Sequence, residues 1–434
     1  MDVGSMPTDQ GEAGADDERV LFAWVEQVCG GPIQSSAQTS GGNRARSWAM
    51  DVAVPGGTRE VFLRYTLPRP PSAEPYTTHR EAQVYRAIAP IPIRAPKLIA
   101  EHPSIAAILT DRAHGIAEFR RLADPVVKQR IAAEFMADLA TLHAHPVDGI
   151  VLDASGTGSR IADHVGAELA IWRAMYDETG RADPLLDLAF AWLAEHMPDP
   201  DGAVALVHGD AGPGNFLFRD GHLTALIDWE LAHLGDPMED LAWFSMRCVM
   251  EPVPDFAASL RDYERAGGRP IDRARVLYHR VLVSTRVVVI RHRNVSGEPA
   301  HAIVSRALNR RLLVEALAEA SGTAVAWPAP MQAPPSPRAA LFAGVLADLR
   351  DVIVARSTDG QVIAKAKNVA KVIKYLEAAD RYGAATEPAG ALPDDFAGKL
   401  AHFARLVTRE AQLAAGASGG IADRHYPALP ERSE

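Results

Sequence analysis

The stretch from Leu206 to Phe244 constrains the fold of this 434-residue chain more than any other segment. It reads LVHGDAGPGNFLFRDGHLTALIDWELAHLGDPMEDLAWF, in which short apolar runs are joined by glycine-rich turns. Asp220-Gly221 lies between two of these runs, which is a strong signal for a β-hairpin. Such a hairpin returns Asp228 to the side of Asn215 and Asp210. Two carboxylates and one amide are therefore expected to converge at its open end.

This convergence favours phosphoryl transfer, which needs positioning and charge neutralisation more than covalent chemistry by the protein. Asn and Asp oxygens are hard ligands of the kind that Mg²⁺ prefers. A further carboxylate can bind the acceptor hydroxyl and take its proton. A carboxylate pair of a glycoside hydrolase, formed by Asp228 and Glu230, is a more distant interpretation, because both follow a short hairpin.

His208-Gly209-Asp210, with Asn215 five residues after the aspartate and Asp228 thirteen after the asparagine, resembles one branch of the protein-kinase-like fold. That branch holds the aminoglycoside phosphotransferases and choline kinases, and the kinase catalytic-loop signature has the same internal spacing. The resemblance implies that Asp210 is the catalytic base and that Asn215 and Asp228 hold Mg²⁺. It also implies that His208 braces the loop and that ATP is the phosphoryl donor.

Two neighbouring segments carry a closer resemblance: IDWE at 227–230 and LGDPMEDLA at 234–242. They are most similar to the phosphotransferase domain joined to acyl-CoA dehydrogenases in some fusion proteins. The resemblance covers roughly residues 20–320 and is specific mainly over 206–244. It implies a hydroxyacyl-coenzyme A as the acceptor. Residues 236–239 are interpreted as a helix start, with an N-cap Asp, Pro at N1 and Glu at N3.

The first part of the chain matches the resemblance less closely. Ser40, Gly41 and Gly42 stand where a phosphate-covering loop is expected, although an ordinary turn explains them too. Related folds carry a strand lysine that grips the phosphates and pairs with a helix Glu. Here Arg64 occupies that strand, and Glu81 is its expected partner. A guanidinium can bind phosphate through two hydrogen bonds. The alternative for this pair is a surface ion pair.

The pattern along the chain predicts a small β-rich lobe, a larger α-rich lobe and an appended small all-α module, and the resemblance implies that the two lobes form an α+β, two-lobed protein-kinase-like fold. Apolar runs at 47–54 and 60–67 flank Pro55-Gly56-Gly57 and predict a hairpin, followed by a helix over 78–89. We expect a strand at 104–110 and mostly helix over 128–197. Two short strands are then expected within 204–228, and helices follow as far as residue 320. The expected domains are a nucleotide-binding N-lobe at 19–113 and a catalytic, substrate-binding C-lobe at 114–322.

Both ends of the chain differ in composition from these lobes. Residues 1–18 are acidic and predict a disordered tail rather than a signal peptide. Five prolines crowd residues 321–338, so 323–337 is expected to be an extended linker. Beyond it, apolar periodicity predicts helices near 338–356, 362–382 and 395–415. This module, 338–434, has no catalytic constellation, and self-association or binding of a partner is its expected role.

Charge and composition narrow the classes of function. The net charge of −10, from 45 basic and 55 acidic residues, argues against nucleic-acid binding. Only two cysteines occur, and no apolar run is long enough to span a membrane, so we expect a cytoplasmic protein without membrane contact. A small molecule with a hydroxyl group is then the expected substrate.

Residues 273–311 have the opposite charge, with nine arginines against one acid. This segment predicts either a surface for an anionic acceptor, such as a hydroxyacyl-coenzyme A, or a salt-bridged helix face. Three functions remain open. The favoured one is an ATP- and Mg²⁺-dependent small-molecule kinase, and the others are an antibiotic-modifying phosphotransferase and a nucleotide-binding pseudokinase or scaffold.

Overall fold

The computed structural model describes residues 9–39, 45–67, 72–198, 202–293, 299–383 and 390–431. The chain divides into two compact units. The first comprises Met1–Ala167, Asp201–Asp240 and Val253–Ile271, and the second comprises Glu168–Pro200, Leu241–Pro252 and Asp272–Glu434. These units differ from the predicted domains, because the chain passes between them within two helices and because residues on both sides of the expected linker belong to the second unit.

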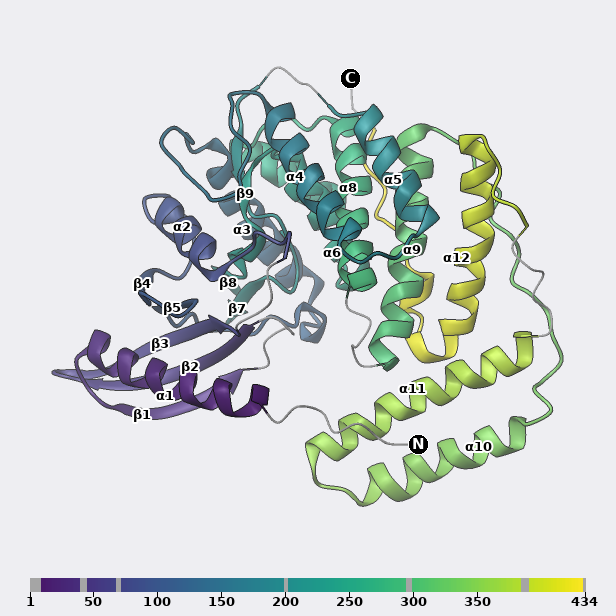
Figure 1. The fold of residues 1–434 in the computed structure, drawn as a ribbon, viewed down its shortest axis with the longest axis horizontal. Coiled ribbons are helices and arrows are strands. Elements are labelled where there is room, and N and C mark those ends of the chain that lie inside the picture. The colour runs from purple at the N-terminus through teal and green to yellow at the C-terminus, as the bar shows by residue number, and fades with distance from the viewer. Residues whose placement is uncertain are drawn as a thin grey trace. The chain divides into compact units, whose positions relative to one another are not determined.

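A five-stranded antiparallel sheet with the order β1-β2-β3-β5-β4 forms the base of the first unit (Figure 1). Its strands are β1 (Ile33–Thr39), β2 (Ala45–Val54), β3 (Gly57–Thr66), β4 (Leu98–Glu101) and β5 (Ala107–Asp111). The predicted hairpin is confirmed as β2 and β3, where Val54 pairs with Gly57 across a two-residue turn. Gly56 in that turn has a φ of 97°, which a glycine adopts without strain.

In the described part of the first unit, four α-helices lie wholly within it: α1 (Asp9–Cys29), α2 (Thr78–Ile88), α3 (Pro125–Ala144) and α7 (Phe256–Arg265). The prediction of a disordered tail through residue 18 is wrong for its described part, since α1 begins at Asp9. Leu21 and Val25 of α1 join the buried core of the sheet. Glu18 accepts hydrogen bonds from Arg46, at 2.8 Å, and from Tyr65. Its charge therefore has a specific partner on the sheet, which composition alone does not reveal.

The segment that opened the sequence analysis forms two small antiparallel pairs. They are β6 (Ala205–Val207) with β9 (His233–Gly235), and β7 (Phe216–Arg219) with β8 (His222–Leu226). The β7–β8 turn consists of Asp220 and Gly221, with φ values of 53° and 78°, as a tight hairpin turn of this kind requires. The predicted hairpin is confirmed, with three strands rather than two within 204–228.

The second unit is helical. It contains α5 (Pro184–Glu195), α8 (Arg273–Arg293), α9 (Pro299–Ser321), α10 (Ala339–Ala347), the π-helical segment η3 (Asp348–Val354), α11 (Gly360–Tyr382) and α12 (Phe396–Ser418). The chain crosses into this unit within α4 (Ile161–Asp177) and α6 (Met238–Met250). The three helices predicted after the proline-rich segment are confirmed.

The C-terminal helices are joined to the helices that precede the proline-rich segment. Helix α12 packs against α9, where Glu410 forms ion pairs with Arg306 and Arg310 at 3.6 and 3.3 Å. The backbone of Met331, within the proline-rich segment, exchanges two hydrogen bonds with the side chain of Gln412 on α12. Among the described residues, no helix has the length and apolar character needed to cross a membrane.

Candidate active site

A buried aspartate fixes the backbone of the glycine-rich loop in the first unit. The N–H groups of His208 and Gly209 donate to the two carboxylate oxygens of Asp240, at 2.7 and 2.9 Å. Asp240 is fully buried and also contacts His143 Nε2 at 2.9 Å, while Nδ1 of that ring contacts the Tyr263 hydroxyl. Sequence reasoning missed Asp240, because nothing in the helix start around it shows that its side chain points back to the loop.

The loop also closes tightly against the segment that carries Asp228. Gly209 has a φ of 76°, and a Cβ atom there would lie 2.2 Å from the carbonyl oxygen of Leu231, so only glycine fits. His208 Nε2 donates to the carbonyl of Ile227 at 3.0 Å, and its ring packs on Trp229. His208 thus joins the loop to the end of the β7–β8 hairpin.

The hairpin brings Asn215 and Asp228 together, as predicted. Asn215 directly precedes β7 and Asp228 follows β8, and the Asn215 carbonyl accepts from Ile227 N–H at 3.0 Å. Asn215 Nδ2 donates to the Asp210 carbonyl at 2.8 Å, which ties the third predicted residue to the same cluster. Asp228 has a φ of 66°, in the left-handed region that costs most non-glycine residues about 1–2 kcal/mol. Residues held in such conformations are concentrated at functional sites.

Arg64 of β3 reaches this cluster with its whole guanidinium group. Its Nε lies 3.3 Å from Glu81 of α2, its Nη1 lies 2.9 Å from Asp228 Oδ1, and its Nη2 bonds to Glu230. The expected pair of Arg64 with Glu81 is present, and it is not a surface pair, since the Glu81 side chain is 3% exposed. Glu230 is a third carboxylate on the same cation.

One cation among three carboxylates shifts the pKa values of this cluster. Burial acts to lower the pKa of Arg64, but Glu81, Asp228 and Glu230 together raise it, so Arg64 stays charged. Burial raises the pKa of Glu81 to about 7, with Arg64 opposing the shift and the other two carboxylates adding to it. The cluster therefore carries an excess of negative charge that a further cation would compensate.

The donor set fits a Mg²⁺ ion that arrives with phosphate oxygens. In the described part of the chain, no three His, Cys, Asp or Glu side chains are grouped so as to hold a metal on their own. Asn215 uses its amide nitrogen on the Asp210 carbonyl, which leaves Oδ1 to act as an acceptor, and the Asp228 side chain is 36% exposed. Mg²⁺ commonly takes one or two protein oxygens and completes its shell with phosphate and water.

The sequence also singled out two other sets of residues, the expected phosphate-covering loop and the arginine-rich segment. Ser40, Gly41 and Gly42 lie outside the described residues, in the connection between β1 and β2. The arginines of residues 273–311 are largely engaged within the second unit. Seven of them form ion pairs with acids of that unit: Arg273, Arg280, Arg286, Arg293, Arg306, Arg310 and Arg311. The salt-bridged interpretation of this segment therefore describes it better than an anion-binding surface.

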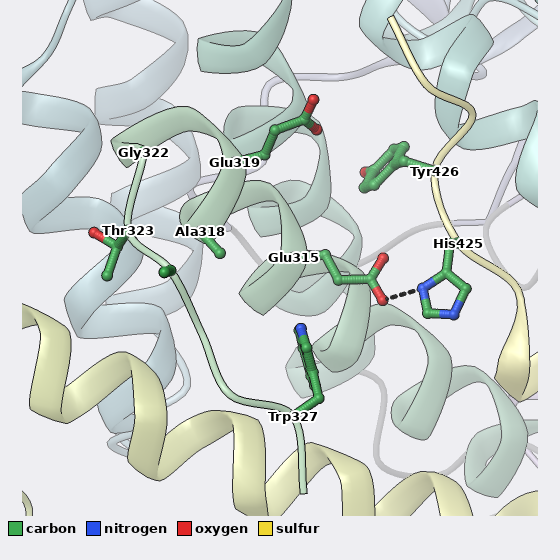
Figure 2. A pocket seen from close by; sticks show the side chains of 9 residues that line it. Glu315, Ala318, Glu319, Gly322, Thr323, Trp327, His425 and Tyr426 are labelled. Carbon is green, nitrogen blue, oxygen red and sulfur yellow. Dashed lines mark hydrogen bonds and ion pairs between the residues drawn. The ribbon is translucent and has the colours of Figure 1, made fainter.

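A pocket of about 440 Å³ in the second unit does not add to this site. Figure 2 shows it between the end of α9 and the C-terminal segment that carries His425 and Tyr426. Glu315 accepts from His425 and Arg311, and Glu319 pairs with two arginines. Both carboxylates are thus already neutralised by side chains of the protein.

The chain is similar to several known proteins. Acyl-CoA dehydrogenase family member 11 of Rattus norvegicus is 30% identical over 125 residues, which are 28% of this chain and 16% of that protein. Probable acyl-CoA dehydrogenase IBR3 of Arabidopsis thaliana is 27% identical over 277 residues, which are 58% of this chain and 33% of that protein. The chain therefore spans only a third or less of these relatives. The resemblance to the domain joined to acyl-CoA dehydrogenases is confirmed.

A solved structure shows the fold, and a family model shows the class of enzyme. A putative aminoglycoside phosphotransferase from Ralstonia eutropha JMP134 has a TM-score of 0.54 and 21% identity, covering 70% of this chain and 98% of that one. At this identity the likeness shows the fold alone, and it confirms the predicted protein-kinase-like class. Residues 40–277, more than half of the chain, match the model of the phosphotransferase enzyme family. The chain belongs to the phosphotransferase enzyme family, whose members transfer phosphate to hydroxyl groups of small molecules.

Proposed function

We propose that this phosphotransferase moves the γ-phosphoryl group of ATP to the hydroxyl group of a small molecule, with Mg²⁺ as the metal. One observation carries the proposal: the loop with Asp210 and Asn215, the hairpin end with Asp228, and the Arg64–Glu81 pair meet in the first unit. This set contains a base, two hard oxygen ligands and a cation for phosphate, as phosphoryl transfer requires.

In this proposal the Asp210 carboxylate accepts the proton of the substrate hydroxyl. Asp210 is partly exposed, so a substrate can reach it, while its backbone is tied down by Asn215 and the loop before it by Asp240. A base whose backbone is held in this way presents its carboxylate to the substrate from a fixed point of the loop. His208 supports that position through its bond to the Ile227 carbonyl.

Arg64 binds the phosphates of the nucleotide, and Glu81 keeps the guanidinium in place from the buried side. To do so, Arg64 exchanges its bonds to Asp228 and Glu230 for phosphate oxygens. Asn215 Oδ1 and the released Asp228 would hold Mg²⁺, which when bound neutralises charge on the phosphates. Ser40, Gly41 and Gly42 are proposed to cover the phosphates with their backbone N–H groups.

For the acceptor we propose a hydroxyacyl thioester of coenzyme A. The support is the similarity to two proteins named as acyl-CoA dehydrogenases. The arginine-rich helices add no support, because their guanidinium groups are engaged with acids of the same unit. Aminoglycosides, sugars and amino alcohols are the comparison acceptors.

Asp210→Asn tests the proposal in an assay for phosphorylated product with ATP, Mg²⁺ and this panel of acceptors. We expect a loss of about 10²–10⁴ in kcat, as removal of a positioned base commonly causes. Asp220→Asn is the matched control, because Asp220 is exposed and Asn suits the same turn. Wild-type turnover by the Asp210 variant contradicts its role, and nucleotide binding without product over the whole panel supports the pseudokinase alternative.

A further inference from the structure

Helix α7 carries a buried tyrosine, Tyr263, that no step of the proposed reaction uses. Its hydroxyl lies 2.9 Å from Nδ1 of the buried His143 on α3. The other nitrogen of that ring, Nε2, lies 2.9 Å from Asp240 Oδ2. Asp240 in turn accepts hydrogen bonds from the N–H groups of His208 and Gly209. Three buried side chains therefore connect α7 to the backbone just before the proposed catalytic base.

The hydrogen bonds assign a proton to each atom of this chain. Both oxygens of Asp240 accept backbone N–H groups, as a carboxylate does, so His143 Nε2 carries a proton and donates it to Oδ2. The backbone N–H of Arg269 donates to the Tyr263 oxygen at 3.2 Å. The hydroxyl's own proton then goes to His143 Nδ1, and the imidazole is neutral. An imidazolium would leave that proton without an acceptor in the described part of the chain.

The Tyr263 hydroxyl remains a donor at neutral pH. Burial raises the pKa of Tyr263 well above its ordinary value, and the Asp240 carboxylate adds to this shift while the Arg269 N–H opposes it. A neutral phenol can donate one hydrogen bond and accept another at the same time. Both of these bonds are present here.

The segment that follows α7 is shaped around this tyrosine. Gly268 lies directly against the ring, since a Cβ atom there would be 2.5 Å from Tyr263 Cε1. Gly267 has a φ of 93° and turns the chain back, and Gly268 N–H donates to the Tyr263 carbonyl at 3.0 Å. The next residue, Arg269, thereby brings its N–H onto the hydroxyl. Both partners of the hydroxyl are therefore fixed by the fold.

We propose that Tyr263 is a positioning residue for phosphoryl transfer. Its hydroxyl fixes the orientation of the His143 ring, so that Nε2 points at Asp240 and the carboxylate holds the N–H groups of the loop. Without the hydroxyl, the ring is held by one hydrogen bond and Nδ1 is a buried acceptor without a donor. The inference rests on the proposed role of Asp210 as the base, but the ordering of the loop can be measured without any turnover.

The competing explanation is that the Tyr263 hydroxyl serves stability alone. Its removal then lowers the melting temperature and leaves both the loop and the turnover unchanged. Tyr278 of α8 supplies the matched control, because it is also buried and its hydroxyl also donates a hydrogen bond. The acceptor is the Leu193 carbonyl, at 3.1 Å, within the second unit.

Tyr263→Phe tests the proposal in the full chain, because Phe keeps the ring that packs edge-on against His143. Hydrogen–deuterium exchange with mass spectrometry follows the His208 and Gly209 N–H groups in the peptide 206–210. We expect exchange there to be about tenfold faster than in the wild type, as loss of one supporting hydrogen bond allows. Peptides from the five-stranded sheet, and the 206–210 peptide of Tyr278→Phe, are expected to exchange as in the wild type.

Turnover on the acceptor found with the panel gives the second measurement. For Tyr263→Phe we expect kcat to fall about tenfold or more, because a displaced base slows the chemical step. The KM for ATP is expected to stay within about twofold, because the contacts of Arg64 are unchanged. Tyr278→Phe is expected to keep the wild-type kcat. Wild-type kcat and wild-type exchange in Tyr263→Phe overturn the proposal, even if the variant melts earlier.

Thermal melting followed by circular dichroism shows whether each variant is folded. If Tyr263→Phe is unfolded, Gly268→Ala takes its place, because the added Cβ pushes on the ring and displaces the hydroxyl. Unfolding of both variants assigns Tyr263 to folding alone and overturns the proposal. If the wild type phosphorylates no acceptor, the proposed function fails, and the exchange of the 206–210 peptide still decides whether Tyr263 orders the loop.

Discussion

At the scale of single residues, the contacts of Arg64 explain why this position holds an arginine where related folds carry a lysine. Its Nε, Nη1 and Nη2 each have a different carboxylate partner, from α2 and from the segment after β8. A lysine ammonium is one point on a flexible stem and cannot reach three partners in this fixed arrangement. An arginine at this position is thus consistent with the two further carboxylates, Asp228 and Glu230, that lie beside it.

Arg64→Lys is expected to weaken nucleotide binding about tenfold or more, because hydrogen bonds between charged groups are worth about 1.5–3 kcal/mol each. The measurement is the KM for ATP together with calorimetric affinity for the Mg²⁺–nucleotide. Arg59→Lys, on the same strand and 40% exposed, is the control and is expected to bind like the wild type. Equal affinities for the wild type and Arg64→Lys would show that Arg64 does not touch the nucleotide.

At the scale of elements, the β7–β8 hairpin places the site because its turn and its open end are both fixed. Phe216 pairs with Leu226, so Asn215 lies opposite Ile227, and Asp228 is the next residue along the chain. The Asp-Gly turn was readable from the sequence because it demands positive φ values. The helix start at Asp236 was readable too, and its carboxylate accepts from Met238 N–H at 2.9 Å.

Gly221→Ala is expected to destabilise the protein by about 1–2 kcal/mol, because φ is 78° there. An added Cβ would also lie 2.4 Å from Arg130 Nη2, although that side chain can move. Chemical denaturation gives the free energy of unfolding. Gly360→Ala, at the start of α11 and with nothing within 4 Å of its Cβ position, is expected to be neutral or slightly stabilising. A stable Gly221 variant would mean that the turn tolerates strain without loss.

At the scale of the whole molecule, the arginine-rich helices hold the second unit together. Arg280 is 1% exposed and bonds to Ser245 of α6, Glu319 of α9 and the carbonyl of Pro427. Arg286 pairs with Glu168 and lies over the ring of Trp172. Segments far apart in sequence are thus joined by guanidinium groups, which donate in several directions at once.

Arg280→Ala is expected to destabilise the second unit by about 1.5–3 kcal/mol, because it removes the charged hydrogen bonds to Glu319 and Pro427 and leaves the buried Ser245 hydroxyl without this partner. Thermal and urea unfolding measure the loss, and kcat per folded molecule should not change. Arg306→Ala is the control, since that side chain is 67% exposed and its ion pair is worth at most about 1 kcal/mol. Loss of turnover with unchanged stability would instead assign Arg280 to substrate binding.

The sequence by itself determined the β7–β8 hairpin and the three helices after the proline-rich segment, because these features depend on local rules of turns, caps and periodicity that act over a few residues. The fold class followed from the resemblance of the loop motif to a known family. The sequence did not show that residues 9–18 are helical, because the partners of Glu18 lie on two distant strands, β2 and β3. Only the tertiary structure showed Asp240 beneath the loop, Glu230 on Arg64 and the arginines of 273–311 in ion pairs. Each of these depends on which distant side chain faces which, and local sequence rules do not encode that pairing.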